Sequence, residues 1–100
     1  MFVHIVFWRL KESANGKSSQ ENALEMRRRF EALKGVIPDM PRLDLGIDVS
    51  RGEASADVAL YTEFTSSAAH DVYQAHPAHL DIVTFVKTVV SERRVVDYEV

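Results

Sequence analysis

The sequence contains no cysteine among its 100 residues. Disulfide bonds, thiolate nucleophiles and cysteine-ligated metal sites are therefore excluded. Internal repeats and low-complexity segments are also absent. We expect one domain, residues 1–100. A domain of this size buries only roughly 60 to 65% of the surface that its unfolded chain exposes, so it gains stability from a partner.

Clustered positive charge is lacking as well. The formal net charge is −3 at pH 7. Nucleic-acid binding depends on Lys and Arg side chains that neutralise phosphates, so we expect no nucleic-acid partner. The one basic run, Arg27–Arg29, lies among Glu21, Glu25 and Glu31, which indicates a solvated helix face.

No segment has the features of a membrane span or a signal peptide. The apolar start "MFVHIVFWRL" has no basic region and no small-residue cleavage site, and it is too short to cross a bilayer. We expect a cytoplasmic protein with no membrane partner. A hydrophobic content of 46% with 27% charged residues is typical of a folded globular domain.

Residues 2–10 predict a strand that is apolar on both sides. Side chains alternate along a strand, so one face holds Phe2, His4, Val6, Trp8 and Leu10, and the other holds Val3, Ile5 and Phe7. Both faces need cover. The chain is long enough for only one layer of helices, so something else must cover the second face.

Residues 18–35 predict an amphipathic helix. Ser18 is the expected N-cap, with Glu21 as its capping-box partner. The spacing of three and four predicts a buried stripe of Ala23, Met26, Phe30 and Leu33. Lys34 and Gly35 are expected to end the helix.

The next segments predict a hairpin and then a broken helix. Leu43, Leu45, Ile47 and Val49 alternate with polar or small residues, and "RGEASA" connects them to a second strand, "DVALYTEF". A short helix follows from Thr65 and cannot continue through Pro77. His76 is expected to be extended because it precedes proline, and Pro77 suits the first position of a new helix. The expected apolar stripe of that helix is Leu80, Val83, Val86 and Val90, and "RRVVDYEV" predicts a final strand.

The predicted order is βαββαβ, which indicates an α+β, ferredoxin-like fold. In this fold a four-stranded antiparallel sheet carries its helices on one face. The other face is bare although its strands are apolar. We therefore expect a homodimer in which two sheets face each other and form a dimeric α/β barrel.

Several segments resemble one family over nearly the whole chain. They are "HIVFWRLKE", "IPDMPRLDLGIDVS", "DVALYTEFTS", "VYQAHPAHL" and "SERRVVDYEV". Together they are similar to the stress-responsive α/β-barrel (Dabb) family. The resemblance implies a dimeric α+β barrel. Many members have no known activity, some are plant stress proteins, and one plant branch closes linear polyketides by intramolecular aldol condensation.

The resemblance to the cyclase branch implies three functional positions. Its first-strand histidine matches His4, and its catalytic tyrosine and histidine match Tyr73 and His79. Two pocket positions depart from the cyclase: Phe30 stands where the cyclase has a tyrosine, and Val58 where it has a histidine. These departures imply a more apolar pocket and put the cyclisation reaction itself in doubt.

The chemistry of such a site is concrete. Removing a proton beside a carbonyl requires a base that titrates near neutral pH, and we expect neutral His79 in this role because it lies at a helix N-terminus. Tyr73 could donate to the carbonyl oxygen, while His4 could orient a ligand. Trp8 could line the pocket or belong only to the core. The alternative is that Tyr73 and His79 only pack and make local hydrogen bonds.

The other polar candidates have simpler interpretations. His76 is expected to be a hinge. A zinc site from His76 and His79 lacks further ligands, so we expect no metal and no cofactor. His70 is expected to be exposed. Asp97 and Tyr98 are assigned to strand pairing or to a dimer contact.

The function predicted from these observations is the binding of a small, mostly apolar carbonyl compound in a pocket between sheet and helices. One alternative is a cyclase-like enzyme, isomerase or lyase with His79 as base and Tyr73 as donor. A second alternative is a non-catalytic stress-response protein. Convergence of Tyr73 and His79 on one cavity, with His4 at its wall, would favour binding or catalysis.

Overall fold

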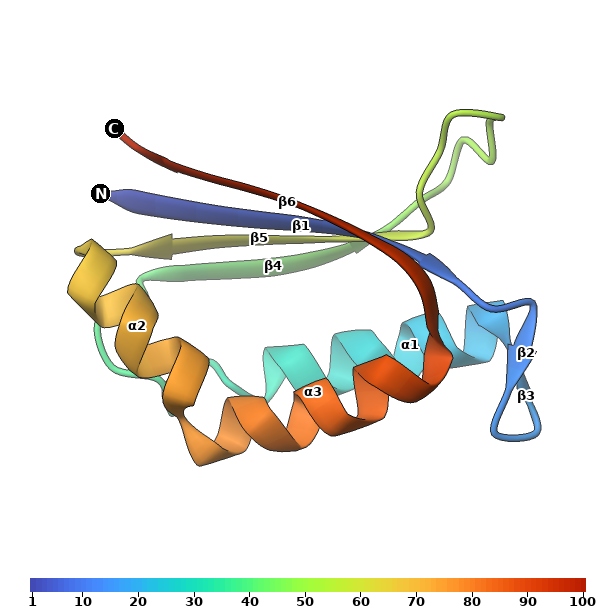
Figure 1. The fold of residues 1–100 in the computed structure, drawn as a ribbon, viewed down its shortest axis with the longest axis horizontal. Helices are drawn as coiled ribbons and strands as arrows, with labels where there is room; N and C mark the ends of the chain where they lie inside the picture. The colour runs from blue at the N-terminus through green and yellow to red at the C-terminus, as the bar shows by residue number, and fades with distance from the viewer.

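The computed structural model describes residues 1–100 and shows one sheet covered on one side by helices (Figure 1). The elements in chain order are β1 (Phe2–Leu10), β2 (Ser13–Ala14), β3 (Lys17–Ser18), α1 (Ser19–Glu31), β4 (Arg42–Ile47), β5 (Val58–Phe64), α2 (Ser67–Ala75), α3 (Pro77–Val89) and β6 (Val90–Glu99). The main sheet has the order β4-β5-β1-β6, and every pairing is antiparallel. The predicted α+β, ferredoxin-like fold is confirmed. The small hairpin β2-β3 was not predicted.

Strand β1 lies at the centre of the sheet and sets the register of both neighbours. His4 is opposite Thr62 of β5 and Asp97 of β6. Trp8 is opposite Val58 and Arg93 in the same way. Directly opposite residues point to the same face of a sheet, so this register decides which side chains meet under the helices.

Helix α1 begins as the sequence predicts. Ser18 Oγ accepts from the backbone N–H of Glu21 at 3.2 Å, and Glu21 Oε1 accepts from the backbone N–H of Ser18 at 3.0 Å. The predicted stripe is buried in full, with Ala23, Met26, Phe30 and Leu33 all in the core. Gly35 adopts a φ of +79°, a conformation in which glycine avoids the strain of a Cβ atom.

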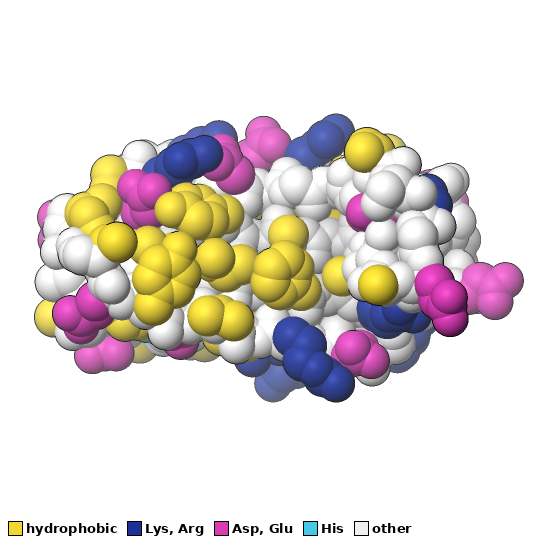
Figure 2. Space-filling view, turned by 90° about the horizontal axis from the view of Figure 1, so that it is seen from above, with side chains coloured by type: hydrophobic (Ala, Val, Ile, Leu, Met, Phe, Trp, Pro, Cys, Tyr) yellow, Lys and Arg dark blue, Asp and Glu magenta, His cyan; other side chains and the backbone are white.

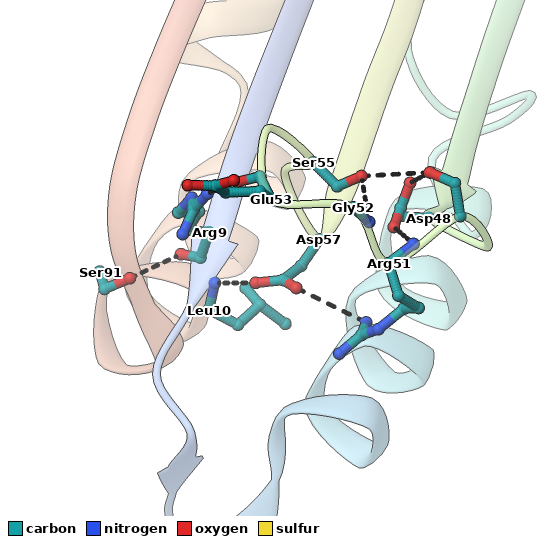
Figure 3. Close-up of polar contacts among 10 residues, drawn as sticks. Arg9, Leu10, Asp48, Arg51, Gly52, Glu53, Ser55, Asp57 and Ser91 are labelled. Atoms are coloured by element: carbon teal, nitrogen blue, oxygen red, sulfur yellow. Dashed lines mark hydrogen bonds and ion pairs between the residues drawn. The ribbon is translucent and has the colours of Figure 1, made fainter.

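The loop after β4 corrects one detail of the predicted hairpin. Val49 was expected to continue the alternation, but β4 ends at Ile47 and Val49 is 92% exposed. Two carboxylates organise the loop (Figure 3). Asp48 accepts from the backbone N–H of Arg51 at 2.8 Å, and Asp57 accepts from the backbone N–H of Leu10 at 2.7 Å. The carboxylate of Asp48 thus closes a turn where the pattern predicts that the strand continues.

His76 joins the two C-terminal helices as a hinge. Its φ and ψ of −68° and 133° are extended, as expected for a residue before proline. Its Nδ1 also accepts from the backbone N–H of Ala78 at 3.1 Å, which caps α3.

The predicted stripe of α3 is partly wrong. Leu80 is 49% exposed, whereas the buried residues of this helix are His79, Ile82, Val86 and Val89. The backbone angles of the hinge set the rotation of α3 about its axis, and apolar spacing alone does not report that rotation.

The sheet face opposite the helices carries hydrophobic side chains, which gather over much of that face in Figure 2. Phe7, Val96 and Tyr98 are 42%, 52% and 43% exposed, and Ile5 lies opposite both Tyr61 and Val96. This is the bare apolar face expected from the sequence. None of the helices has the length and apolar character that crossing a membrane requires.

Candidate functional site

A cavity of about 420 Å³ lies between the helix-facing side of the sheet and the helices. Its volume is within the usual range for small-molecule pockets. It is lined by His4, Val6, Trp8, Phe30, Leu60, Tyr73, Gln74, His79, Val83, Val86, Lys87, Val90 and Arg93. The structure thus brings five of the six predicted site residues to one cavity.

The exception among the predicted site residues is Val58, which does not line this cavity. Val58 is buried opposite Trp8, and Leu60 on the same strand face takes the place at the wall. A step of two residues along a strand moves a side chain by roughly 6 to 7 Å on the same face. The resemblance identified the correct face of β5 but not the correct position along it.

Tyr73 and His79 meet across the helix break, with ring centroids 4.1 Å apart. Tyr73 lies in the last turn of α2 and His79 in the first turn of α3, so the turn at His76 brings these rings together. The Nδ1–H of His79 donates to the backbone carbonyl of Gln74 at 3.3 Å. Its Nε2 is left with a free lone pair.

Burial sets the protonation state of both rings. It lowers the pKa of His79 below the ordinary value of 6.5, and the positive charge of Arg93 lowers it further, while the bond to Gln74 opposes the shift. Burial raises the pKa of Tyr73 above the ordinary value of 10.0. At neutral pH the pair therefore consists of a neutral imidazole and a protonated phenol.

Two buried donors at the cavity have no partner within the protein. They are the hydroxyl of Tyr73 and the Nε1–H of Trp8. Buried polar groups are nearly always hydrogen-bonded, and an unpaired one is costly. Two such groups at one cavity indicate places where a ligand can supply the missing acceptor.

His4 is held by Asp97 from the neighbouring strand. The Nδ1–H of His4 donates to Asp97 Oδ1 at 2.5 Å, and the two residues are opposite each other in the register of β1 and β6. His4 is buried, while the side chain of Asp97 is 39% exposed. The expected strand-pairing position of Asp97 is confirmed. Its bond to His4 was missed because only the strand register reveals it.

The prediction for His70 is wrong, because this residue is buried with 6% of its surface exposed. Its ring stacks on Phe2 at a centroid distance of 4.7 Å and lies 4.6 Å from the His4 ring. Burial lowers the pKa of His70, and the neighbouring His4 adds to the effect. Helix α2 presents His70 and Tyr73 to the sheet, and the adjacent Asp71 faces outward.

His4, His70 and Asp97 form one group of side chains that could hold a metal ion. One ligand atom from each lies within 4.8 Å of the other two. Imidazole and carboxylate ligands together suit zinc and similar ions. In this structure the facing atoms of His4 and Asp97 are bonded directly to each other. The absence of a metal site and of a cofactor stays a prediction.

Sequence reasoning also missed the two cations of the cavity, Lys87 and Arg93. Lys87 lies on α3 one turn after Val83, on the side of that helix that faces the cavity. Arg93 is opposite Trp8 on β6. The alternation of residues along the last strand assigns Arg93 to one of the two faces of that strand. Only the pairing with β1 shows which of these faces lies over the cavity.

Comparisons with known proteins agree on the fold. The family model described as the stress responsive A/B barrel domain (Dabb) matches residues 2–100. A dimeric protein of unknown function with a ferredoxin-like fold from Bacteroides fragilis is 25% identical, with a TM-score of 0.87 over 99% of this chain and 95% of that one.

Two further solved structures resemble the chain. A dimeric ferredoxin-like protein of unknown function from Thermobifida fusca is 17% identical, with a TM-score of 0.86 over 99% of this chain and 90% of that one. The hydroxynitrile lyase of Passiflora edulis is 21% identical, with a TM-score of 0.80 over 97% and 90%. No curated protein matches this chain.

Proposed function

Because this chain belongs to the stress-responsive α/β-barrel (Dabb) family, we propose that its cavity binds a small, mostly apolar carbonyl compound. One observation carries the proposal: the unpaired hydroxyl of Tyr73 lies at the wall of an otherwise largely apolar cavity, beside neutral His79. A carbonyl oxygen is an acceptor that suits this donor, and the apolar walls suit the rest of such a molecule.

The walls of the cavity support an apolar ligand body. Val6, Phe30, Leu60, Val83 and Val86 surround the space between the polar groups. The Tyr73 hydroxyl has almost no solvent-accessible surface. A ligand oxygen would therefore bond to it after a small movement of a neighbouring ring, which would show as a chemical-shift change localised to the cavity.

A matched pair of ligands and a matched pair of variants test the proposal. Binding of aryl alkyl ketones and of the corresponding hydrocarbons, which lack the oxygen, is measured by NMR titration. We expect the ketones to bind more tightly, and we expect Tyr73→Phe to remove that preference. A neutral hydrogen bond contributes about 1 kcal/mol, which corresponds to about a fivefold preference.

The control for this variant is Tyr61→Phe. Tyr61 lies on the opposite face of the sheet, where its hydroxyl donates to Glu63 at 2.8 Å. The ketone preference should be unchanged in this variant. Equal binding of ketone and hydrocarbon by the wild type would refute the proposed role of Tyr73.

A second candidate function is catalysis at the carbon beside the carbonyl. The neutral His79, with Nδ1–H bonded to Gln74, has its Nε2 lone pair available as a general base. Tyr73 would donate to the oxygen on which negative charge develops. The lyase from Passiflora edulis supports the fold alone at its level of identity, so this candidate depends on the geometry of the pair.

Hydrogen–deuterium exchange tests this chemistry without knowledge of the substrate. A bound ketone is incubated in D₂O, and loss of the proton signal next to its carbonyl is followed by NMR. We expect exchange in the wild type and background exchange in His79→Gln. His76→Asn is the control, because it removes a histidine outside the cavity and keeps a residue able to cap α3.

Ketone binding without any exchange would assign the protein to the non-catalytic alternative, a stress-related binding module. In that case His79→Gln would change ligand affinity but no rate. The exchange experiment thus separates the two alternatives.

We propose further that the bare sheet face forms a homodimer. Phe7, Val96 and Tyr98 are exposed on this face, and its apolar character resembles that of a subunit interface. Phe7→Glu would place a charge in the shared core and should yield monomers in size-exclusion chromatography with light scattering. Leu80→Glu, at a similarly exposed position on the helix side, should remain dimeric. A wild type that is monomeric at micromolar concentration would refute the proposal.

A further inference from the structure

We infer that the ligand of this cavity is an organic anion whose carboxylate binds Lys87, about 12 Å along α3 from His79, together with Arg93. The inference rests on the proposed function and adds the charge and the orientation of the ligand. It follows from the positions of the two cations, from their lack of partners and from the absence of any carboxylate at the cavity wall.

Helix α3 and strand β1 run in the same direction. Residues near the starts of both elements therefore lie at one end of the cavity, and residues near their ends lie at the other. The start of α3 lies near His4 through the contact of His79 with Tyr73, and its end lies near Lys11, whose backbone N–H donates to the carbonyl of Val89 at 2.8 Å. His79 and Lys87 are eight residues apart on this helix, which is about 12 Å. His4 and Trp8 on β1 are separated by a similar distance, about 13 Å.

The register places the backbone of Arg93 toward the Lys87 end of the cavity, and the guanidinium is close enough to Tyr73 and His79 to lower the pKa of both. Arg93 is directly opposite Trp8, so its side chain lies on the cavity face of the sheet. The Nε1–H of Trp8 has no partner and is buried, so it can donate to the same acceptor group only after a movement of the indole ring. Long flexible cations and a fixed indole donor together suit an oxyanion.

Arg93 lacks the partners that the other arginines of this protein have. Each of the other arginines lies within 4.0 Å of a carboxylate or donates to a carbonyl. The side chain of Arg93 has neither kind of contact, and Lys87 forms no ion pair or side-chain hydrogen bond. No Asp or Glu lines the cavity. The cavity wall therefore carries two positive charges with no internal counter-charge.

A keto acid of suitable shape is the probe for this inference. In 6-oxo-6-phenylhexanoate an apolar chain connects a ketone to a carboxylate. Its primary amide has nearly the same size without the charge, and 1-phenylhexan-1-one lacks the carboxyl group altogether. Affinities of the three compounds are measured by calorimetry or NMR titration at low ionic strength.

We expect the acid to bind about fivefold to tenfold more tightly than the amide, since exposed ion pairs are modest in strength. The double variant Lys87→Met, Arg93→Gln should bind acid and amide equally. Arg94→Gln is the control, because Arg94 is on the opposite face of β6 and pairs with Glu92, and the preference should persist in it. The single tryptophan provides a local signal, because its indole N–H resonance should shift more with the acid than with the amide.

Three other outcomes would refute the inference, and each has a different consequence for the proposed carbonyl function. Equal affinity of acid and amide for the wild type refutes the anion and leaves the ketone proposal in place. A preference that survives in the double variant shows that other residues bind the carboxylate. If none of the three compounds binds, the proposed carbonyl function fails together with the inference.

Discussion

Replacing Tyr73 by phenylalanine should stabilise the protein while weakening ligand binding. The hydroxyl of Tyr73 is buried and has no hydrogen-bond partner. Leaving a buried hydroxyl unpaired costs roughly 1 to 3 kcal/mol. Tyr73→Phe keeps the ring contacts with Phe64 and His79 and removes the unpaired oxygen. We expect the free energy of unfolding to rise by about 1 kcal/mol after allowance for the small void that remains.

Urea unfolding monitored by tryptophan fluorescence measures this effect, because Trp8 is buried and is the only tryptophan. The slope of the free energy against urea is about 1 to 3 kcal/mol per molar for small proteins, so the midpoint should rise by roughly 0.3 to 1 M. The thermal midpoint should rise by about 4 to 8 °C for each kcal/mol. All variants are compared at one protein concentration, because a dimer is stabilised by mass action.

Tyr61→Phe is the matched control for the stability measurement. Its hydroxyl donates to Glu63 at 2.8 Å, so its removal should lower the free energy of unfolding by roughly 0.5 to 1.5 kcal/mol. The two substitutions delete the same atom and should act in opposite directions. A loss of 1 kcal/mol or more in Tyr73→Phe would refute the reasoning, because it would mean that the hydroxyl has a partner in solution.

Three further predictions concern pH and local structure. Burial lowers the pKa of His70 and His79, so the unfolded chain binds more protons below the ordinary pKa of 6.5. The free energy of unfolding should be constant above pH 6.5 and should decrease as the pH drops through the folded-state pKa values. His79→Gln should make this decrease smaller. Gly35→Ala should lower the free energy of unfolding by about 1 to 2 kcal/mol in urea unfolding, because a residue with a Cβ atom is strained at a φ of +79°. No atom crowds the added methyl group, so the backbone strain alone causes this loss. No loss would refute the left-handed turn. Ser18→Ala should cost about 1 kcal/mol by removing the capping box, and an unchanged midpoint would refute that role.

Local features of the chain were predictable because their causes are local. The capping box of Ser18 and Glu21 depends on two residues three positions apart. The buried stripe of α1 repeats through Met26 and Phe30 over several turns, so its phase is well determined. The extended geometry of His76 follows from the ring of Pro77 alone.

The errors lie where distant segments decide the outcome. His70 is adjacent to Asp71 in the sequence, but the packing of α2 against Phe2 and His4 buries it. The phase of α3 depends on the hinge, so Leu80 faces solvent. Asp97 at His4 and Arg93 at Trp8 result from a strand register that links the two ends of the chain.

The sequence by itself determined the order of strands and helices, the apolar character of both sheet faces and the break at Pro77, because alternation, capping and proline geometry act over a few residues. It also supplied the family resemblance that singled out Tyr73 and His79. Only the tertiary structure decided that these rings meet at 4.1 Å beside unpaired buried donors, and that two cations line the same cavity. The physical reason is that pairing register and helix rotation are set by contacts between segments far apart in the chain, which no local pattern encodes.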